Sequence, residues 1–247
     1  MDLQLGDGEV VGLVGPSESG KTTVCLVASG LAPRAIRGTL TGRLLLGAED
    51  TAPLQMHDLA AQVGICFQDP AAQLSTVCET VYEEVAFGPM NLGLPRADVL
   101  ARTEAALDAM GISHLAERDP ARLSGGQMQL VAMAGLFATR PRHLILDEPT
   151  AQLDPAGTKS VAAAIRRLAA DGTAILIAEQ KTDLLARICD RVVVLDTGRV
   201  AFEGSTSEVF GDPRLTALGV GEPSDIRLMR LAREAGVDTM RLQAVLP

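Results

Sequence analysis

One eight-residue segment constrains the fold of this chain more than any other feature. Residues 15–22 read Gly-Pro-Ser-Glu-Ser-Gly-Lys-Thr and match the pattern G-x-x-x-x-G-K-[ST]. The segment follows an apolar stretch, residues 10–14, and precedes a stretch with helical periodicity, residues 22–31. A bent glycine-rich loop between a strand and a helix directs backbone N–H groups at phosphate oxygens, and the positive end of the helix dipole adds to the attraction. The motif therefore predicts a phosphate-binding loop in an α/β domain.

The side chains of this loop have predicted contacts of their own. Lys21 would reach the β- and γ-phosphates of a nucleotide, and the hydroxyl of Thr22 would ligate Mg²⁺. A chance glycine-rich turn is the alternative interpretation, and the strand–loop–helix context disfavours it. The loop residues expected to contact nucleotide are Gly15, Pro16, Ser17, Glu18, Ser19, Gly20, Lys21, Thr22 and Thr23.

An apolar strand that ends in two acids supplies the expected partner of this loop. Residues 143–148 read His-Leu-Ile-Leu-Asp-Glu. Asp147 is expected to bind the metal, and Glu148 is expected to orient or deprotonate the attacking water. Acids that merely end a strand are common, but a phosphate loop upstream favours the catalytic interpretation.

A second anion-binding helix end is predicted at residues 123–127, which read Leu-Ser-Gly-Gly-Gln. Ser124 occupies an N-cap position, and Gly125 and Gly126 leave the N–H groups of the helix start accessible. An ordinary capped helix is the alternative. One triphosphate has room for two such helix ends only if they approach it from opposite sides.

Composition limits the classes of partner. The chain has 22 Lys and Arg against 31 Asp and Glu, a net charge of −9, and only 2% aromatic residues. An acidic chain gains little from a polyphosphate backbone, and few aromatics are present to stack on bases, so nucleic acid is not an expected partner. The four scattered cysteines suit neither a disulfide framework nor a zinc site, and neither a signal peptide nor a membrane span is expected.

Short apolar runs alternate with helical periodicity, which predicts an α/β domain with a largely parallel sheet. The middle of the chain, residues 70–140, is more helical than its flanks and is expected to be a helical insertion. A turn at residues 196–198 predicts a hairpin. The expected strands cover residues 10–14, 143–147, 173–178, 192–195 and 199–203, and the expected helices cover residues 22–31, 97–117, 125–139, 158–170 and 225–235.

Taken together, the motifs resemble those of the ATP-binding-cassette (ABC) ATPases, over essentially the whole chain from Leu5 onward. The matching parts are the phosphate loop, residues 123–127, Asp-Glu-Pro-Thr at 147–150 and Leu-Asp at 153–154. More narrowly, two segments are similar to the energy-coupling-factor group, whose ATPases power the uptake of vitamins and of cobalt or nickel ions. These segments are Phe-Gln-Asp-Pro-Ala-Ala-Gln-Leu at 67–74 and Val-Tyr-Glu-Glu-Val-Ala-Phe-Gly-Pro at 81–89.

The resemblance implies a single ABC ATPase domain over residues 1–247. Its α/β fold would combine a P-loop NTPase core and largely parallel sheet with an inserted helical signature-motif subdomain and a short antiparallel β hairpin. The implied division places the P-loop core at residues 1–69 and 141–204, the Q-loop and helical subdomain at 70–140, and a C-terminal extension at 205–247.

The resemblance also implies a head-to-tail dimer with ATP and Mg²⁺ at its interface. The partner is a second ABC ATPase subunit, in a homodimer or a heterodimer, and each nucleotide lies between the phosphate loop of one subunit and the signature helix of the other. Gln68 would complete the coordination of Mg²⁺ and sense the γ-phosphate, and Asp154 would connect the two sites. The implied catalytic residues are Lys21, Glu148 and Gln180, the implied metal ligands are Thr22, Gln68 and Asp147, and the implied signature contacts are Ser124, Gly125, Gly126 and Gln127.

The segment from Gln73 to Gly88 would lie beside the groove that receives a helix of an integral membrane subunit, so the protein is expected in the cytoplasm, peripheral on the inner face of the cell membrane. Alternatively, this helix and loop only pack on their own core. The implied function is an ATP-binding and ATP-hydrolysing subunit that energises an importer of the energy-coupling-factor type. The alternatives are a soluble non-transport ABC ATPase and a non-hydrolysing subunit that dimerises with ATP.

Three features depart from the family pattern. Glu18 stands where this group usually has Gly; a carboxylate that faces phosphates would weaken binding, and one that points to solvent would cost much less. Gln180 stands at the switch position, where the family usually has His; a Gln amide can donate to a γ-phosphate but carries no charge. The family's aromatic residue that stacks on adenine is missing before Phe67, which lowers the expected base affinity unless another residue or a partner supplies the stacking face. A misassigned start codon would explain the missing aromatic residue equally well.

Two of these departures affect the same site. Glu18 and Gln180 would both face the nucleotide held by this chain's own phosphate loop, whereas residues 124–127 would serve the nucleotide of the partner. We therefore expect an asymmetric pair in which this subunit's own site is the weaker one. Glu148 argues the other way, because an inactive site has no need of a general base.

Overall fold

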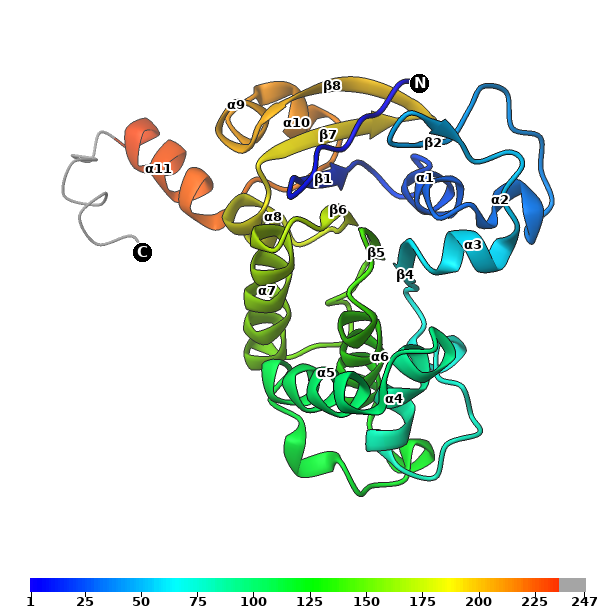
Figure 1. Cartoon of the computed structure of the whole chain (residues 1–247). Coiled ribbons are helices and arrows are strands. Elements are labelled where there is room, and N and C mark those ends of the chain that lie inside the picture. The colour runs from blue at the N-terminus through cyan, green and yellow to red at the C-terminus, as the bar shows by residue number, and fades with distance from the viewer. Residues whose placement is uncertain (236–247) are drawn as a thin grey trace.

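A twisted sheet forms the centre of the molecule, seen here in a computed structural model that describes residues 1–235. Within these residues the sheet has six strands in the order β4-β5-β6-β1-β7-β8. Its pairs are parallel, apart from β7 and β8, which are antiparallel (Figure 1). The strands are β1 (Val10–Val14), β4 (Val63–Cys66), β5 (His143–Asp147), β6 (Ala174–Ala178), β7 (Arg191–Asp196) and β8 (Arg199–Ser205).

The central strands are apolar along their whole length because helices cover both faces of the sheet. All five residues of β1 and of β6 are buried. Successive residues of β6 point to opposite faces, so Ile175 and Ile177 belong to one hydrophobic cluster and Leu176 belongs to the other. Register places Leu13 beside Ala178, and Ala178 beside Asp147, so the ends of β1, β5 and β6 meet at one edge.

Different helices cover the two faces. Helix α1 (Lys21–Ala28) contacts β5 and β6 and contributes Cys25 to the cluster that contains Leu176. On the other face lie α7 (Pro155–Ala170), α8 (Thr182–Ile188) and α9 (Thr206–Phe210). The site described below depends on this arrangement, because the loops that join β1 to α1, β5 to α7 and β6 to α8 emerge at the carboxyl edge of the parallel strands.

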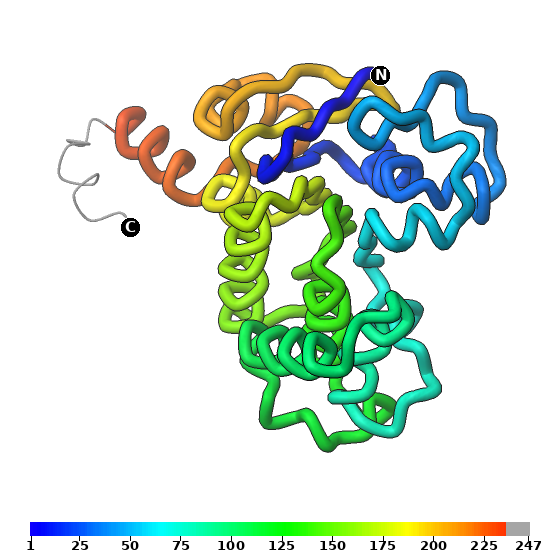
Figure 2. The backbone as a smooth tube through the Cα atoms, viewed as in Figure 1, coloured from blue at the N-terminus to red at the C-terminus, as the bar shows by residue number. Residues whose placement is uncertain are grey.

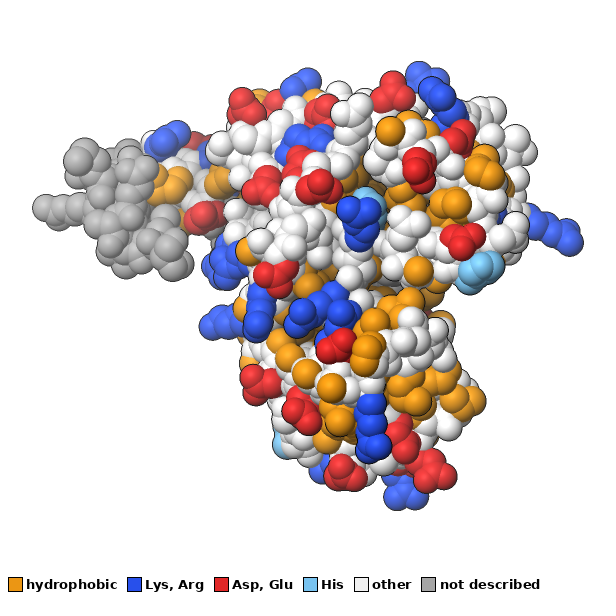
Figure 3. Space-filling model, viewed as in Figure 1, with side chains coloured by type: hydrophobic (Ala, Val, Ile, Leu, Met, Phe, Trp, Pro, Cys, Tyr) orange, Lys and Arg blue, Asp and Glu red, His pale blue; other side chains and the backbone are white. Residues whose placement is uncertain are grey.

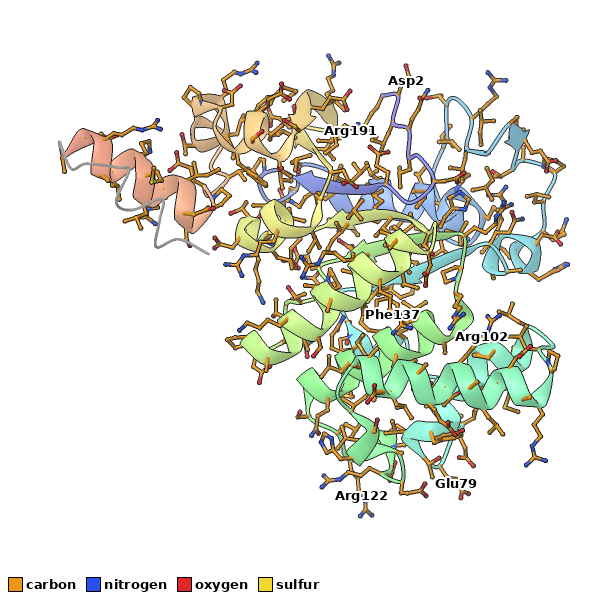
Figure 4. The ribbon with its side chains drawn as sticks, turned by 60° about the vertical axis from the view of Figure 1, so that its left-hand side comes forward. Asp2, Glu79, Arg102, Arg122, Phe137 and Arg191 are labelled. Atoms are coloured by element: carbon orange, nitrogen blue, oxygen red, sulfur yellow. The ribbon has the colours of Figure 1, made fainter. Side chains whose placement is uncertain are left out.

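Three helices form a group beside the sheet, in the lower half of Figure 1. They are α4 (Val81–Asn91), α5 (Arg96–Ala109) and α6 (Gly125–Thr139), which contact one another, and α6 also contacts β4 and α7. Arg102 on α5 donates to the carbonyl of Thr139 at the end of α6, 3.2 Å away, close to the buried ring of Phe137 (Figure 4). Glu79 and Arg122 lie at the far end of this helical group from the sheet (Figure 4).

The remaining elements are short and peripheral. The backbone trace shows the N-terminus beside β7 and β8, and α11 projecting on the opposite side (Figure 2). No helix among the described residues is both long enough and apolar enough to cross a membrane. These elements are α2 (Leu31–Arg34), β2 (Leu45–Leu46), β3 (Glu49–Asp50), α3 (Met56–Ala60), α10 (Pro213–Ala217) and α11 (Ser224–Glu234).

The largely parallel sheet and the hairpin at residues 196–198 are confirmed. Some helix boundaries were wrong. The helix predicted over 97–117 ends at Ala109, because Gly111 has a left-handed backbone with φ of +70°. The helix predicted from 158 begins at Pro155, because the side chain of Asp154 caps it. The helix predicted over 22–31 ends at Ala28.

Some elements had no predicted bounds. Strand β4 and helix α8 lie in segments with no assigned element, whereas α4 lies within the region 70–140 that was expected to be helical. The tail contains α9 and α10 in addition to the one helix expected there. Helix α11 covers Ser224–Glu234 rather than 225–235. Residues 236–247 of the expected C-terminal extension lie outside the described residues.

Candidate functional site

The loop between β1 and α1 is shaped by close backbone approach. A Cβ atom added to Gly15 would overlap the carbonyl oxygen of Leu195. Gly20, which caps α1, has φ of +101°, a conformation that glycine adopts at little cost. The N–H of Gly198 donates to the carbonyl of Ser19 over 3.0 Å, so the turn between β7 and β8 supports the loop from behind.

Lys21 is the cation of the loop. Its Nζ donates to the carbonyl oxygens of Gly15 and Pro16, at 2.9 Å each, and only 8% of the residue is exposed. The ammonium group therefore lies against the loop backbone, where it stabilises the bend. The same group can donate to a phosphate that the loop holds.

Asp147 lies at the carboxyl end of β5, next to the loop. It is 5% exposed, and the hydroxyl of Thr22 donates to its carboxylate. Burial raises the pKa of Asp147; the Thr22 hydrogen bond and the Lys21 charge oppose this rise, whereas the neighbouring Glu148 adds to it. A buried carboxyl beside a hydroxyl provides two oxygen ligands of the kind that Mg²⁺ prefers.

Glu148 has an unusual backbone and two side-chain partners. Its φ is +49°, and its N–H donates to the carbonyl of Ala178 over 2.8 Å. The side-chain amide of Gln180 donates to Oε1 over 2.6 Å, and that of Gln68 donates to Oε2 over 2.9 Å. Two amides from different loops therefore hold the carboxylate that was predicted to act on water.

These side chains surround a single pocket of about 340 Å³. The structure thus brings together residues from four separate segments that the sequence had assigned to one site. Gly15, Pro16 and Ser19 form the base of the loop, and Asp147 lies next to Thr22. The pocket is lined by Ser17, Glu18, Gly20, Lys21, Thr22, Thr23, Gln68, Glu148 and Gln180.

The other predicted site residues lie outside this pocket. Ser124 caps α6 in a capping box, in which Ser124 Oγ accepts from the N–H of Gln127 and Gln127 Oε1 accepts from the N–H of Ser124. A Cβ on Gly125 would overlap the side chain of Gln152, so the start of α6 packs on the segment that leads to Asp154. The start of α6 and this segment form a second location, distinct from the pocket.

Buried polar residues that the sequence did not single out support the pocket. Glu179 is 3% exposed and accepts the hydroxyl of Thr150, which is fully buried, over 2.7 Å. Lys181 Nζ donates to the carbonyl of Thr150 over 2.6 Å. The sequence did contain a signal for Glu179, because this acid directly follows the apolar strand β6. In the same way, Asp147 ends the apolar strand β5 and Glu148 follows it.

A family model described as ABC transporter matches residues 1–151 of the chain. The chain belongs to the ABC transporter family. Among its relatives, the energy-coupling factor transporter ATP-binding protein EcfA1 of Symbiobacterium thermophilum is 40% identical, over 98% of this chain and 82% of the relative. The cobalt import ATP-binding protein CbiO of Rhodobacter capsulatus is 39% identical, over 94% of this chain and 81% of the relative.

A solved structure gives the same result for the fold of this ABC protein. The structure of CbiO1 from Clostridium perfringens, described as part of the ABC transporter complex CbiONQ, superposes with a TM-score of 0.74. The two chains are 32% identical, and the match covers 93% of this chain and 90% of the other. The sequence-based assignment to the ABC ATPases is therefore confirmed, and so is the α/β fold that it implied.

Two departures of this ABC protein from the family pattern have structural correlates. Glu18 has φ of +63°, so the expected unusual torsion at this position is present, and its exposed side chain lines the pocket. A non-glycine residue in this conformation costs about 1 kcal/mol. Gln180, which the resemblance placed at the switch position, is exposed and donates to Glu148, the predicted general base.

Proposed function

We propose that this chain is the ATP-binding and ATP-hydrolysing subunit of a membrane importer of the energy-coupling-factor type, for vitamins or transition-metal ions. The observation that carries the proposal is the pocket in which Lys21, Gln68 and Glu148 lie together beside the buried Asp147. The relatives named for energy coupling and for cobalt import support the importer class.

The residues present fit ATP and Mg²⁺. The loop at Gly15 leaves no space for a side chain, because a Cβ there would overlap the carbonyl oxygen of Leu195 and the hydroxyl of Ser19, so the bend of the loop is fixed beside the pocket. The buried hydroxyl of Ser19 has no hydrogen-bond partner among the described residues. Thr22, Gln68 and Asp147 supply oxygens to Mg²⁺ in this proposal, and the loop N–H groups and Lys21 bind phosphate.

Hydrolysis in this proposal depends on Glu148 and Gln180. Glu148 orients or deprotonates the water, and its position is set by the two amides that donate to it. Gln180 also donates to the γ-phosphate. Each Gln amide has two N–H groups, so a hydrogen bond to Glu148 leaves one donor free.

A second ABC subunit completes the site in this proposal, in a homodimer or a heterodimer. The support is the separation described above: Ser124, Gly125, Gly126, Gln127 and Asp154 do not line the pocket that contains Lys21. The N-terminal end of α6, a 15-residue helix, carries a positive partial charge that favours an anion there. The signature residues thus bind the nucleotide of the partner subunit.

An integral membrane subunit docks at the segment from Gln73 to Gly88, so the protein works at the cytoplasmic face of the membrane. Apolar side chains are exposed in and beside this segment: Val77 is 72% exposed and Met90 62%. Hydrophobic side chains gather on the helical group in Figure 3. The buried Glu84 accepts the N–H and the hydroxyl of Ser75 at 2.6 and 2.7 Å, which gives the segment a defined shape for a partner.

We further propose that this chain's own site is the weaker one of an asymmetric pair. Glu18 places a carboxylate at the pocket that binds a polyanion, and Gln180 provides a neutral amide in place of a possible cation. Because Glu148, the predicted general base, is present, we expect the turnover of ATP at this site to be slowed rather than abolished.

The test is phosphate release by the purified pair, with Glu18→Gly and Gln180→His introduced singly and together. Both changes are expected to raise the rate, by roughly 3- to 10-fold each, because each corresponds to about 1 kcal/mol of phosphate interaction. If neither change raises the rate, the proposed asymmetry of the two sites is wrong. If no form releases phosphate although ATP is bound, the function is ATP-dependent dimerisation and not hydrolysis. Co-purification with ribosomes rather than with a membrane subunit contradicts the importer.

A further inference from the structure

We infer that Glu179 is a positioning residue for hydrolysis, which holds the Gln180 amide on Glu148 through a buried link to Thr150. The inference rests on the proposed function for its catalytic consequence. It extends that function to a residue that does not line the pocket.

Both carboxylate oxygens of Glu179 accept hydrogen bonds. Its Oε1 accepts the backbone N–H groups of Gln180 and Lys181, at 2.9 and 3.2 Å. Its Oε2 accepts the hydroxyl of Thr150 at 2.7 Å. The carboxylate thereby fixes the position of the Gln180 backbone and so of the base of its side chain. Glu179 is 3% exposed, so little water competes for these hydrogen bonds.

A second hydrogen bond makes the link reciprocal. Lys181 Nζ donates to the carbonyl of Thr150 over 2.6 Å, while the Thr150 hydroxyl donates to Glu179. The loop after β5 and the loop after β6 are therefore joined in both directions. A shift of either loop has to break two hydrogen bonds, one of them between the buried side chains of Thr150 and Glu179, which makes the pair of loops move as one unit.

The link lies between the catalytic carboxylate and the second location. Thr150 is two residues after Glu148, and its carbonyl also accepts the N–H of Leu153 over 3.1 Å. Leu153 precedes Asp154, which caps α7 through the N–H of Gly157 at 2.7 Å. Glu179 thus joins the position of Gln180 to the segment that would face the partner subunit.

The experiment is a cycle of single and double variants, measured by steady-state hydrolysis in the assembled complex. Glu179→Ala is expected to lower kcat roughly 10-fold and to change KM for ATP less than about 2-fold, because it disturbs positioning and not binding. Glu179→Gln is the conservative control and is expected to retain most activity, since its carbonyl accepts the two N–H groups and its NH₂ donates to the Thr150 oxygen. Thr150→Val removes only the hydroxyl donor and is expected to resemble Glu179→Ala, with Thr150→Ser as its control.

The decisive comparison uses Gln180→Ala as the background. A positioning role predicts that Glu179→Ala has less than about 2-fold further effect there, because the group it positions is gone. If Glu179→Ala lowers kcat equally in both backgrounds, or changes only the KM for ATP, the inference is wrong and Glu179 has a general structural role. If Glu179→Ala does not fold, Thr150→Val is compared in the same two backgrounds.

A readout without nucleotide separates this inference from the proposed function. The side-chain NH₂ signals of Gln180, assigned in ¹⁵N-labelled protein by their loss in Gln180→Ala, report the hydrogen bond to Glu148. They are expected to shift to free-glutamine positions in Glu179→Ala and Thr150→Val and to stay in place in Glu179→Gln. Unchanged signals overturn the inference. Absence of ATP hydrolysis by the wild-type complex contradicts the proposed function instead.

Discussion

The side-chain amide of Gln180 lies 2.6 Å from Oε1 of Glu148, so the residue predicted to be the switch contacts the predicted general base. Gln180→His should give the site a titration that the wild type lacks. An imidazole beside this carboxylate is charged below its raised pKa and neutral above it. The ratio of the variant rate to the wild-type rate is therefore expected to be highest near pH 6 and to fall as pH rises. Rate profiles from about pH 6 to 9 measure it, and a flat ratio contradicts the prediction.

The left-handed backbone of Glu18 makes a prediction about stability that can be separated from charge. Glu18→Gly is expected to raise the free energy of unfolding by about 1 kcal/mol, because glycine adopts φ of +63° without strain. This corresponds to about 2–4 °C in Tm for a chain of this size. Glu18→Ala removes the charge but keeps the strain. Both variants should bind ATP more tightly, and only Glu18→Gly should melt at a higher temperature.

The raised pKa of Asp147 predicts that this residue destabilises the protein in the absence of nucleotide. Burial makes the native state hold the proton more tightly than the unfolded chain does, so the ionised carboxylate costs stability at neutral pH. This cost diminishes as pH falls through the raised pKa. Asp147→Asn is therefore expected to raise the denaturant midpoint at pH 7, with a smaller gain at pH 4, and to lower Mg²⁺-dependent hydrolysis at least about 100-fold. A gain that does not depend on pH contradicts the assigned cause.

Two capped helices offer a matched pair of variants for the signature location. Ser124 caps α6 and Ser205 caps α9, each within a capping box. Ser124→Ala and Ser205→Ala are each expected to lower the free energy of unfolding by about 1 kcal/mol. Only Ser124→Ala should also reduce hydrolysis by the assembled complex, because Ser205 does not line the pocket and pairs with Arg191 at the amino end of β7, the opposite edge of the sheet. An equal effect of both variants on hydrolysis removes the signature role of Ser124.

The four thiols differ in accessibility, which gives a probe of the proposed docking surface. Cys25, Cys66 and Cys189 are buried, and burial raises the pKa of Cys66 to about 12, whereas Cys78 is half-buried within the segment from Gln73 to Gly88. Native protein is expected to react with maleimide at Cys78 alone. Binding of the membrane subunit should slow this reaction at least about 10-fold. Cys78→Ser identifies the labelled site, and unchanged labelling in the complex contradicts docking there.

Contiguous motifs made most of the pocket predictable. The loop from Gly15 to Thr22, and the acids Asp147 and Glu148, each combine a local residue pattern with a strand end, and parallel strands bring such ends to one edge. The contact between Gln68 and Glu148 joins residues 80 positions apart. Only the family resemblance placed Gln68 in the site, because no local pattern encodes such a contact.

The missed features have physical reasons. Helix α4 lies in the region expected to be helical, but its bounds were not predicted, because it contains Gly88 and Pro89, which ordinarily interrupt a helix; packing on α6 and α5 stabilises it. Helix α8 has only seven residues, too few to show a clear period. The acceptor role of Glu179 depends on the approach of Thr150 from another loop, which the sequence alone does not show.

The burial of Lys21 affects the rate at which a nucleotide binds, because it limits the distance over which this charge attracts an anion. The chain carries a net charge of −9, so a polyanion in solution is repelled at long range, and this nearly buried ammonium attracts it only close to the loop. At physiological ionic strength charges are screened beyond about 8 Å. Salt therefore weakens the long-range repulsion between the acidic chain and the nucleotide more than it weakens the close attraction to Lys21. Nucleotide capture by this subunit alone should therefore become faster, not slower, when moderate salt is added.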